Sequence, residues 1–468
     1  MKHARGDLPK IAVLGSGGGR RAMIGLLGSL GELSKEGLLD CIMYLSGVSG
    51  STWCMASLYK ESDWSTKLEA LTENIKKRLT GPGVSSLKKG KKLVNYYLNK
   101  DNFCLTDVWA ALVVSTMVNK IDGSGITKQR GNFTNDPYPI YTVIDKQCKY
   151  DRLHKDTWFE ITPDESGYSL TGAFVNSQCL GSKFKDGQKI EDQPQPEMDM
   201  LYLQGVCGSA IADMEEILKL LLHLIEEKST AELTLEEKNG HEVLLNLVQL
   251  NISVLQKQDH DNYLNKLKEL LKEIWIAIVR SIEKALHWIW GKTYNYLYNM
   301  KVEDVDPSVL SSDTREYEDA GLLVNSPYFS VLRKERDIDL IISLDFSAGD
   351  PFLTVVQTSE TCKELHIPFP KVVIPSEDKK EPQDFYLFRG YGKAPTVIHI
   401  PLFNCVNCKG EVKEYEEKYS TLVLSYTSEM ITDLLEKAAL NIRNNKERLL
   451  TEIKNVIEEK KKNKLGLK

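Results

Sequence analysis

A serine lies between two glycines at a point where an apolar run is interrupted. Residues 44–53 read YLSGVSGSTW, and the apolar stretch Ile42–Leu45 predicts a short buried strand. Gly47 and Gly50 allow a sharp backbone turn because neither carries a Cβ. The hydroxyl of Ser49 would then be exposed at the tip of the turn, which is how acyl hydrolases present a nucleophile between a strand and a helix.

The residues after this turn predict a helix. Ser51 and Thr52 can cap a helix that continues through Tyr59. Ser51 also stands where the usual Gly-x-Ser-x-Gly pattern has its last glycine, and a pattern of this kind by itself is common in ordinary turns. A catalytic interpretation of Ser49 therefore needs a second feature.

A glycine-rich turn earlier in the chain is that second feature. The apolar run Ile11–Leu14 is followed by GSGGGRR, after which apolar residues recur at helical spacing until a stop at Gly37. Backbone N–H groups at such a helix start favour a phosphate or a developing oxyanion. The spacing matches neither the dinucleotide fingerprint nor the lysine-containing phosphate loop, which disfavours nucleotide binding. The two turns together predict an esterase that acts on an anionic substrate.

An attacking serine hydroxyl needs a base that accepts its proton, and the sequence contains two candidate arrangements. Ser49, Asp319 and His399 occur in the chain order Ser, Asp, His of α/β-hydrolases. His399 lies in VIHI, a predicted strand, where a structural histidine is the commoner case. A triad through His399 and a mechanism without histidine both remain open on the residues alone.

Several segments, in register along most of the chain, resemble one known family. They read LGSGGGRRAM (14–23), GVSGSTW (47–53), WFEITP (158–163), GSKFK (181–185), EDAG (318–321), LIISLDFSAGD (340–350), IPFP (367–370) and PLFN (401–404). These motifs resemble the catalytic domain of the group IV cytosolic phospholipases A2, the gamma type most of all. The resemblance is weakest in the middle of the chain.

This resemblance implies an α/β fold and a set of site residues. The implied fold is the three-layer, patatin/cytosolic phospholipase-like one, with a mostly parallel central sheet flanked by helices and an inserted helical lid subdomain. Ser49 and Asp319 match a catalytic Ser-Asp dyad without histidine, and Gly18 and Gly19 match the oxyanion hole. The resemblance implies no metal and no cofactor.

Two arginines match the side of the site that binds the lipid headgroup. Arg21 matches the arginine that binds the phospholipid phosphate. Arg336 aligns with a second arginine on the headgroup side, although the run RKER (333–336) is also consistent with a surface charge cluster. Arg20 stands where the family tends to carry an apolar residue, and we expect it to face solvent or to compete for the headgroup.

The domain prediction is a single phospholipase catalytic domain over residues 1–468, with a helical insertion at residues 213–300. From Met214 to about Glu283 the chain is rich in Leu, Glu and Lys at helical spacing, which we interpret as a lid or cap. Within it, the segment Ile274–Trp290 carries an apolar stripe that either packs on the sheet or lies in a membrane interface. A last helix is predicted at Arg443–Glu459.

Composition excludes several classes of protein. An apolar fraction of 42% can build a large core, while a formal net charge of −6 argues against general nucleic-acid binding. No apolar segment is long enough for a signal peptide or a membrane span, which predicts a cytoplasmic protein. The nine cysteines are scattered, with only Cys405 and Cys408 at metal or redox spacing, and predict reduced thiols.

The predicted function is a calcium-independent phospholipase that hydrolyses fatty acyl esters of glycerophospholipids and lysophospholipids, with acyl transfer to lysophospholipid as a further possible reaction. Too little sequence precedes Ile11 for the calcium-dependent membrane module of some relatives, and no calcium loop is visible. No cysteine stands near the C-terminus, so the prenylation box of the mammalian gamma form is not expected. The alternatives are another lipid ester or thioester hydrolase with a Ser49-Asp319-His399 triad, or a non-catalytic lipid-binding protein.

The expected partners are a phospholipid substrate and the surface of intracellular membranes, bound peripherally. Basic neighbourhoods at residues 76–78, 88–92 and 460–462 can lie against anionic lipid, while a solvated helix face is the alternative. The sequence carries no signal for an oligomeric state.

Overall fold

The computed structural model describes residues 8–130, 135–149, 155–191, 194–209, single positions between 242 and 259, 261–270, 290–379, 381–421, 423 and 425–464. These residues divide into two compact units, each described here by itself. Unit 1 takes its residues from 1–80, 126–177 and 319–468. Unit 2 takes its residues from 81–125 and 178–318.

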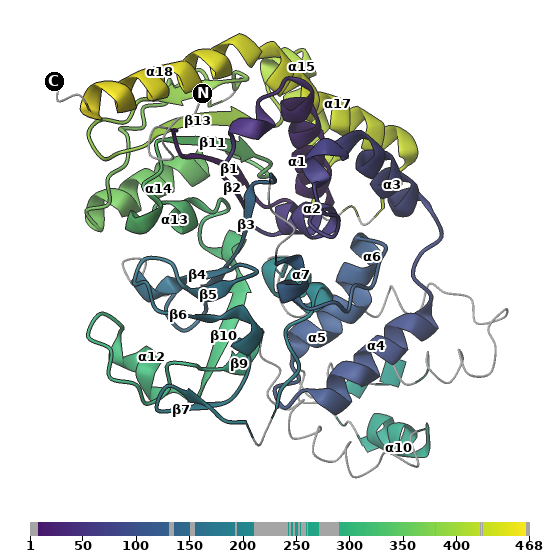
Figure 1. Cartoon of the computed structure of the whole chain (residues 1–468). Helices are drawn as coiled ribbons and strands as arrows, with labels where there is room; N and C mark the ends of the chain where they lie inside the picture. The colour runs from purple at the N-terminus through teal and green to yellow at the C-terminus, as the bar shows by residue number, and fades with distance from the viewer. Residues whose placement is uncertain are drawn as a thin grey trace. The chain divides into compact units, whose positions relative to one another are not determined.

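A mostly parallel sheet forms the centre of unit 1 (Figure 1). Its strands follow the spatial order β12-β13-β11-β1-β2-β3-β4-β5-β6. Strands β13, β11, β1, β2 and β3 run parallel to one another, while β12, β4, β5 and β6 pair antiparallel with their neighbours. The strand bounds are β1 Ile11–Gly15, β2 Tyr44–Gly47, β3 Tyr138–Asp145, β4 Trp158–Ile161, β5 Glu165–Tyr168, β6 Phe174–Asn176, β11 Leu340–Asp345, β12 Tyr386–Phe388 and β13 Thr396–Pro401.

Helices cover both faces of this sheet, which confirms the predicted α/β class (Figure 1). On one face, α13 and α14 pack Val331 and Val355 against Ala12 and Ile341 of the central strands. On the other face lie α1, α2 and α17 (Figure 1). Continuous burial of β1 and β11 explains why both strands are rich in apolar residues, although β11 also contains the buried polar residues Ser343 and Asp345.

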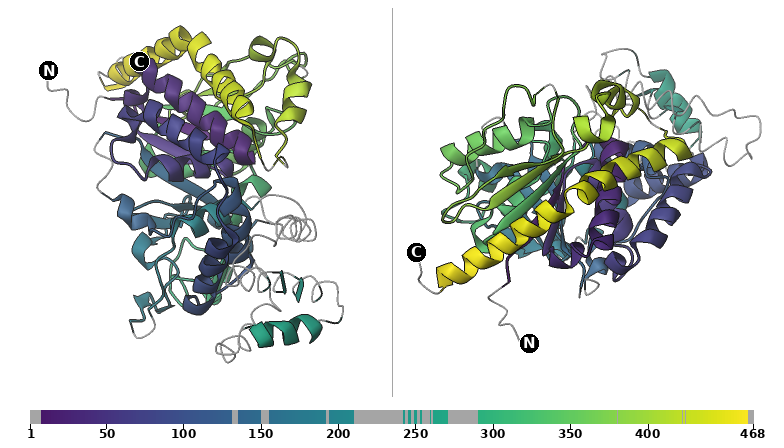
Figure 2. Two further views of the ribbon diagram at one scale, coloured as in Figure 1. Left: turned by 90° about the vertical axis from the view of Figure 1, so that its right-hand side faces the viewer. Right: turned by 90° about the horizontal axis from the view of Figure 1, so that it is seen from above.

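In unit 1, helices follow β1, β2, β11 and β13 along the chain. Their bounds are α1 Gly19–Lys35, α2 Gly50–Leu58, α3 Leu68–Thr80, α13 Tyr328–Val331, α14 Leu353–Glu364, α15 Cys405–Cys408, α16 Val412–Lys418, α17 Ser428–Asn444 and α18 Lys446–Lys464, with short 3₁₀ turns that include η5 Lys155–Thr157, η8 Ala320–Leu322 and η9 Lys334–Arg336. Figures 1 and 2 show α17 running alongside α1. Arg443 of α17 joins Glu32 of α1 through bonds of 2.8 and 3.1 Å.

The predicted last helix was wrong in its extent. Two helices occupy this region, and Asn445 separates α17 from α18. The Asn445 amide group donates to the backbone oxygen of Asn441 and to the carboxylate of Asp384, both buried contacts. An asparagine that bonds the preceding backbone in this way competes with helix continuation, and periodicity does not reveal such a break.

Unit 2 is mainly helical in its described part. It contains α4 Ser86–Asn99, α5 Leu105–Trp109, a π-helical turn Ala110–Val114, α6 Ser115–Met117, α7 Met200–Cys207, α10 Asp261–Leu270 and α12 Pro307–Ser311, with the short strands β7 Phe184–Lys185, β8 Gln188–Lys189, β9 Lys292–Tyr294 and most of β10 Thr314–Asp319. Most of the predicted insertion at residues 213–300, including the apolar stripe up to residue 289, lies outside the described residues. Trp290 at the end of that stripe is described, and its ring contacts the ring of Trp109 edge to face at 6.0 Å.

None of the helices in the described part of the chain is long and apolar enough to cross a lipid bilayer.

Candidate active site

Ser49 lies directly beyond the carboxyl end of β2, at the N-cap position of α2. Its backbone has φ 51° and ψ −124°, a conformation that costs energy in a residue other than glycine. Its residue surface is 8% exposed, and no hydrogen bond joins its hydroxyl to another residue of the described chain. The serine is therefore held in a strained turn with an unengaged hydroxyl, as a nucleophile elbow requires.

The elbow begins and ends at slightly different residues from those predicted. β2 starts at Tyr44 instead of Ile42, and α2 runs from Gly50 to Leu58 with Ser49 itself as the N-cap residue. Ser51 and Thr52 lie inside the helix, so the predicted capping role for them was wrong. The Ser51 hydroxyl instead donates a 2.6 Å hydrogen bond to the backbone oxygen of Ser16.

The bond from Ser51 explains why a serine stands where the usual pattern has a glycine. Ser16 precedes the glycine turn, and its own hydroxyl accepts a 2.6 Å bond from the backbone N–H of Phe346. Ser51 thus links the nucleophile turn to the glycine turn, and Ser16 links the glycine turn to the chain after β11. Glycine at position 51 would supply no such bond.

The glycine turn packs directly against the serine turn. A Cβ added to Gly50 would lie 1.9 Å from the backbone oxygen of Gly19, and one added to Gly17 would lie 2.9 Å from the Cβ of Ser49. Gly18 and Gly19 have φ of 151° and 56°, which only glycine adopts readily. Neither of their N–H groups donates to a residue in the part of the chain that the structure describes. Two unengaged amides at the start of α1 therefore lie beside the elbow, in the arrangement of an oxyanion hole.

Asp319 ends β10 and is fully buried. Its Oδ1 accepts a 2.8 Å hydrogen bond from the N–H of Gly321, which caps η8. Val48 and Ala320, the residues beside Ser49 and Asp319, belong to one buried apolar cluster of unit 1. Packing in this cluster brings the two chain segments together, although no described hydrogen bond joins the hydroxyl of Ser49 to the carboxylate of Asp319.

Asn325 is a positioning residue that was not among the site residues expected from the sequence. Its backbone oxygen accepts from the N–H of Gly17 at 3.0 Å, and its side-chain amide donates to the oxygen of Gly17 at 3.1 Å. The same amide donates to the hydroxyl of Ser347 at 2.8 Å. Asn325 therefore holds the glycine turn to the segment that follows Asp319. The only sequence signal was an Asn-Ser-Pro turn a few residues after the acidic motif.

Arg21 is buried behind the glycine turn. Its guanidinium donates to the backbone oxygens of Phe346 and Tyr419 at 2.8 and 2.7 Å, and more weakly to the hydroxyl of Thr421 at 3.4 Å. Burial lowers its pKa, against the raising effects of Tyr426 and Asp345. Most of its donors are thus occupied by the protein. Arg20 is also buried, contrary to the solvent-facing alternative, and burial lowers its pKa to about 10.

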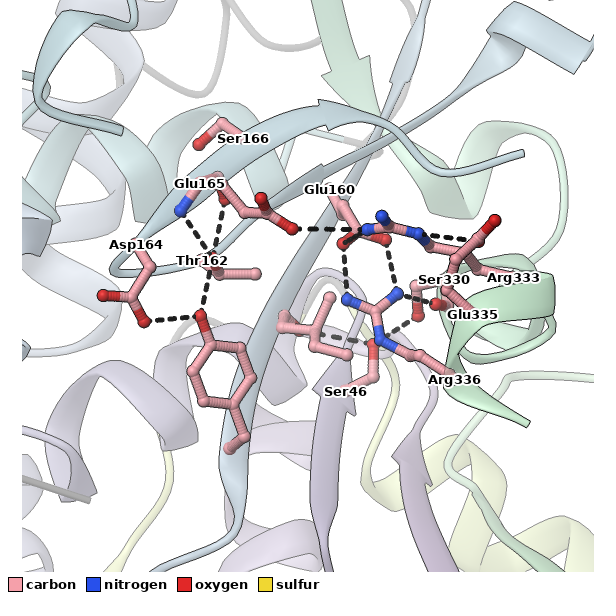
Figure 3. Close-up of polar contacts among 12 residues, drawn as sticks. Ser46, Glu160, Thr162, Asp164, Glu165, Ser166, Ser330, Arg333, Glu335 and Arg336 are labelled. Atoms are coloured by element: carbon pink, nitrogen blue, oxygen red, sulfur yellow. Dashed lines mark hydrogen bonds and ion pairs between the residues drawn. The ribbon is translucent and has the colours of Figure 1, made fainter. Parts of the chain in front are cut away.

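Arg336 lies in a buried ion pair instead of an open headgroup site (Figure 3). Its two terminal nitrogens donate to the two carboxylate oxygens of Glu160 at 2.8 and 2.5 Å, and one of them also donates to the backbone oxygen of Ser330. Burial lowers the pKa of Arg336, but hydrogen bonds and attraction from Glu160 outweigh this and raise it overall. The Ser330 hydroxyl lies 2.8 Å from that of Ser46 on β2. The contacts of Arg336 therefore support the strand that carries the nucleophile turn, and they differ from the headgroup contacts expected.

His399 lies in β13, fully buried, beside β11. Its Nε2 lies 2.7 Å from the backbone oxygen of Pro351, and its Nδ1 has no hydrogen-bonding partner among the described residues. Burial lowers its pKa, against the raising effects of Asp345 and Asp350. No described hydrogen bond joins His399 to Ser49 or Asp319, so its surroundings are those of a structural histidine.

The nine cysteines are all free, including Cys405 and Cys408 at the two ends of α15. Among the described residues, no group of three or more His, Cys, Asp or Glu side chains is placed to hold a metal ion.

The sheet, the nucleophile turn and the glycine turn together define the class of a lipid acyl hydrolase domain. The family model of the lysophospholipase catalytic domain matches residues 11–351, which include both turns and Asp319. Human cytosolic phospholipase A2 gamma is 34% identical over 96% of this chain and 90% of its own length, and the mouse gamma protein is 32% identical over 96% and 86%. The chain therefore belongs to the cytosolic phospholipase A2 family. Membership supports phospholipase A2 and lysophospholipase activity for it.

A solved structure confirms the fold. Human GIVD cytosolic phospholipase A2 superimposes with a TM-score of 0.72 at 23% identity, over 98% of this chain. This chain spans 61% of the length of that protein.

Proposed function

We propose that this chain is a calcium-independent phospholipase that hydrolyses fatty acyl esters of glycerophospholipids and lysophospholipids through an acyl-enzyme on Ser49, with Asp319 as the base. The observation that carries the proposal is the strained Ser49 turn packed against the unengaged amides of Gly18 and Gly19. A nucleophile and oxyanion donors side by side are the minimal machinery of acyl transfer.

The first half of the reaction forms the acyl-enzyme. The Ser49 oxygen attacks the ester carbonyl while its proton passes to the carboxylate of Asp319. The N–H groups of Gly18 and Gly19 hold the oxyanion that forms, and a lost donor of this kind typically costs about 3 kcal/mol of transition-state stabilisation. The tetrahedral intermediate collapses, the glycerol oxygen leaves with the proton from Asp319, and the acyl group stays on Ser49.

The second half releases the acyl group. Water attacks the acyl-enzyme as Asp319 takes its proton, the oxyanion occupies the same amides, and Ser49 leaves with the proton. Lysophospholipid in place of water would accept the acyl group and produce a phospholipid, so the same intermediate supports acyl transfer. Because the Ser49 hydroxyl is not bonded to Asp319 in this structure, the dyad must tighten when substrate binds, as catalytic hydrogen bonds in free enzymes often do.

The two arginines take different parts in this proposal. Arg21, beside Gly18, contributes positive charge behind the oxyanion amides, where a headgroup phosphate would also be attracted. Arg336 acts through its pair with Glu160, which holds the region of β2 and α13 in place. A headgroup contact by Arg336 would require that buried pair to open.

The enzyme would act at the surface of intracellular membranes, because its substrate lies in a bilayer and the ester to be cleaved must reach Ser49 from there. We therefore propose a cytoplasmic protein that binds membranes peripherally. In this proposal residues 213–300 form the lid over the acyl site within one catalytic domain.

Product analysis on defined phospholipid vesicles tests the mechanism. Wild type should release free fatty acid and lysophospholipid, while Ser49→Ala and Asp319→Asn should each lose about 1,000-fold or more in rate, since a nucleophile and its base act as a unit. Ser62→Ala, an exposed serine, is the matched control and should keep full activity. Unchanged activity in Ser49→Ala would instead indicate a lipid-binding protein or a different nucleophile.

A substrate panel separates the remaining hydrolase classes. Phospholipid, neutral lipid and acyl-thioester substrates should be ranked in that order by kcat/KM. Preference for a neutral ester or a thioester over phospholipid would contradict the proposal while leaving Ser49 as the nucleophile.

A further inference from the structure

One cavity of unit 1 is lined by residues other than those of the candidate active site. Its volume is about 500 Å³, which falls within the range of small-molecule sites. Asp337 and Ile338 of its wall lie shortly before β11, and Pro395 directly precedes β13. These residues lie at the amino ends of parallel strands, whereas Ser49 follows the carboxyl end of the parallel strand β2. The wall contains none of Gly18, Gly19, Ser49 and Asp319.

Positive charge dominates the polar part of this wall. Lys155, Arg333, Lys334 and Lys393 line the cavity together with His366, against the single carboxylate of Asp337. Asp337 is itself paired with Lys10 at 3.5 Å. Arg333 pairs with Glu160, Glu165 and Glu335, as Figure 3 shows.

The three lysines have no acidic partner among the residues that the structure describes. Lys155, Lys334 and Lys393 are exposed, and none of them forms an ion pair or a side-chain hydrogen bond with another residue in the described ranges. Three ammonium groups with no described partner around one cavity attract an anion, because their mutual repulsion falls when a negative charge enters.

The rest of the wall is apolar. Leu170, Leu332 and Ile367 line the cavity and pack on the buried cluster that contains Val48 and Ala320. An inorganic anion would leave this surface in contact with water, whereas a ligand with a hydrocarbon part would cover it. The cavity therefore suits a molecule with an anionic head and an apolar tail.

We propose that this cavity binds a long-chain fatty acid anion, with the carboxylate among Lys155, Lys334 and Lys393 and the chain along Leu170, Leu332 and Ile367. A fatty acid has one charge and one chain, which matches one lysine cluster and one apolar wall. The proposal rests on the proposed function only for the source of the ligand, since hydrolysis at Ser49 would release this compound.

Binding of oleate, measured by titration calorimetry on the full chain, tests the proposal. All proteins carry Ser49→Ala, so that turnover plays no part and a failure of the proposed hydrolysis does not affect the result. Relative to this parent, the variant Lys155→Gln/Lys334→Gln/Lys393→Gln should bind oleate at this site at least about tenfold more weakly, because it lacks the three positive charges that attract the carboxylate. Its thermal unfolding should be unchanged, since the three side chains are exposed.

Two control variants distinguish the effect of the lysine charges from the effect of the cavity's shape. Lys379→Gln/Lys413→Gln/Lys461→Gln removes the same charge from exposed lysines outside the cavity and should bind oleate like the parent. Leu170→Trp fills the cavity, keeps its charge, and should weaken oleate binding by a similar factor to the first variant.

Several outcomes would overturn the proposal. Equal oleate affinity in the two lysine variants would show that oleate does not bind in this cavity. Equal affinity for methyl oleate and oleate would show that the carboxylate does not contribute to binding. Binding of vesicles rich in anionic phospholipid that depends on the three lysines, with no lysine-dependent binding of oleate, would assign these charges to a lipid surface instead.

Discussion

The backbone conformation of Ser49 bears directly on its proposed role as the nucleophile. A serine at φ 51° and ψ −124° carries conformational strain that glycine would not. The structure keeps this strain because Val48 is buried, Thr52 bonds the oxygen of Ser49, and Gly50 packs on Gly19. A strained residue held by its surroundings is expected where an oriented hydroxyl is needed.

Relief of this strain should raise stability at the expense of activity. Ser49→Gly should increase the free energy of unfolding by about 1 kcal/mol relative to Ser49→Ala, because the gain from removing strain exceeds the added entropy of an unfolded glycine. Urea denaturation of the two inactive variants measures the difference. A Ser49→Gly variant less stable than Ser49→Ala would show that the turn is not strained.

His399 should affect stability and its pH dependence more than catalysis. Its folded pKa lies below the unfolded value of about 6.5, so below that pH the unfolded chain binds a proton that the folded chain does not. The contribution of His399 is therefore present above about pH 6.5 and is lost as pH falls through that value, although the charges of Asp345 and Asp350 oppose the loss. Denaturation of wild type and His399→Gln at pH 5 to 8 should show a smaller slope in the variant.

Activity of the same variant distinguishes the two candidate mechanisms. His399→Gln should keep most of its phospholipase activity at pH 7.5, since His399 bonds Pro351 and not the nucleophile. Complete loss of activity in a folded His399→Gln variant would instead support a mechanism with a Ser49-Asp319-His399 triad.

At the scale of elements, α1 depends on close contact with α17. A Cβ added to Gly28 would lie 2.5 Å from the backbone oxygen of Leu435, whereas one added to Gly31 on the same helix would meet nothing within 4 Å. Gly28→Ala should destabilise the protein by about 1–3 kcal/mol through overpacking. Gly31→Ala should stabilise it by up to about 1 kcal/mol through helix propensity.

This pair of glycine variants also tests the support of the oxyanion amides. Gly18 and Gly19 stand at the start of α1, so a shift of the helix in Gly28→Ala should lower kcat while Gly31→Ala leaves it unchanged. Thermal unfolding and vesicle assays on both variants measure the two effects. Equal behaviour of the two variants would show that the helix contact has room to adjust.

The buried ion pair between Glu160 and Arg336 also holds neighbouring elements in place. Glu160 on β4 is fully buried between Arg336 and Arg333, and Arg336 reaches the α13 segment through Ser330 (Figure 3). Removing one partner leaves a buried unpaired charge, so Glu160→Gln and Arg336→Met should each cost about 3–5 kcal/mol, and the double variant should cost much less than their sum. Glu436→Gln, which breaks an exposed pair with Arg443, should cost less than about 1 kcal/mol.

At the scale of the whole molecule, the proposed chemistry predicts its response to a chelator. Attack by Ser49, proton transfer to Asp319 and oxyanion binding by amides use no metal ion, so vesicle hydrolysis in excess EGTA should stay within about twofold of the rate with calcium. The assay should use neutral phospholipid, because calcium also changes anionic bilayers. A rate that falls in EGTA and returns with added calcium would contradict calcium independence.

Local patterns in the sequence determined the α/β class and the position of the two turns. The apolar run Ile11–Leu14 marked a buried parallel strand, because such strands are covered on both faces. Glycine clusters marked the turns, because only glycine adopts the φ values found at Gly18 and Gly19. Boundaries were less accurate, as at the start of α2 and at Asn445, since caps and side-chain bonds set them.

Only the tertiary structure decided what each polar side chain bonds. Ser51, Arg336 and Asn325 contact residues far away in the sequence: Ser51 bonds Ser16, Arg336 bonds Glu160, and Asn325 bonds Gly17. No local pattern specifies such partners, because they are chosen by the register of the sheet and the packing of helices on it. The types of residue at the candidate site could therefore be recognised from the sequence. The long-range hydrogen bonds and ion pairs that support the site were apparent only in the folded chain.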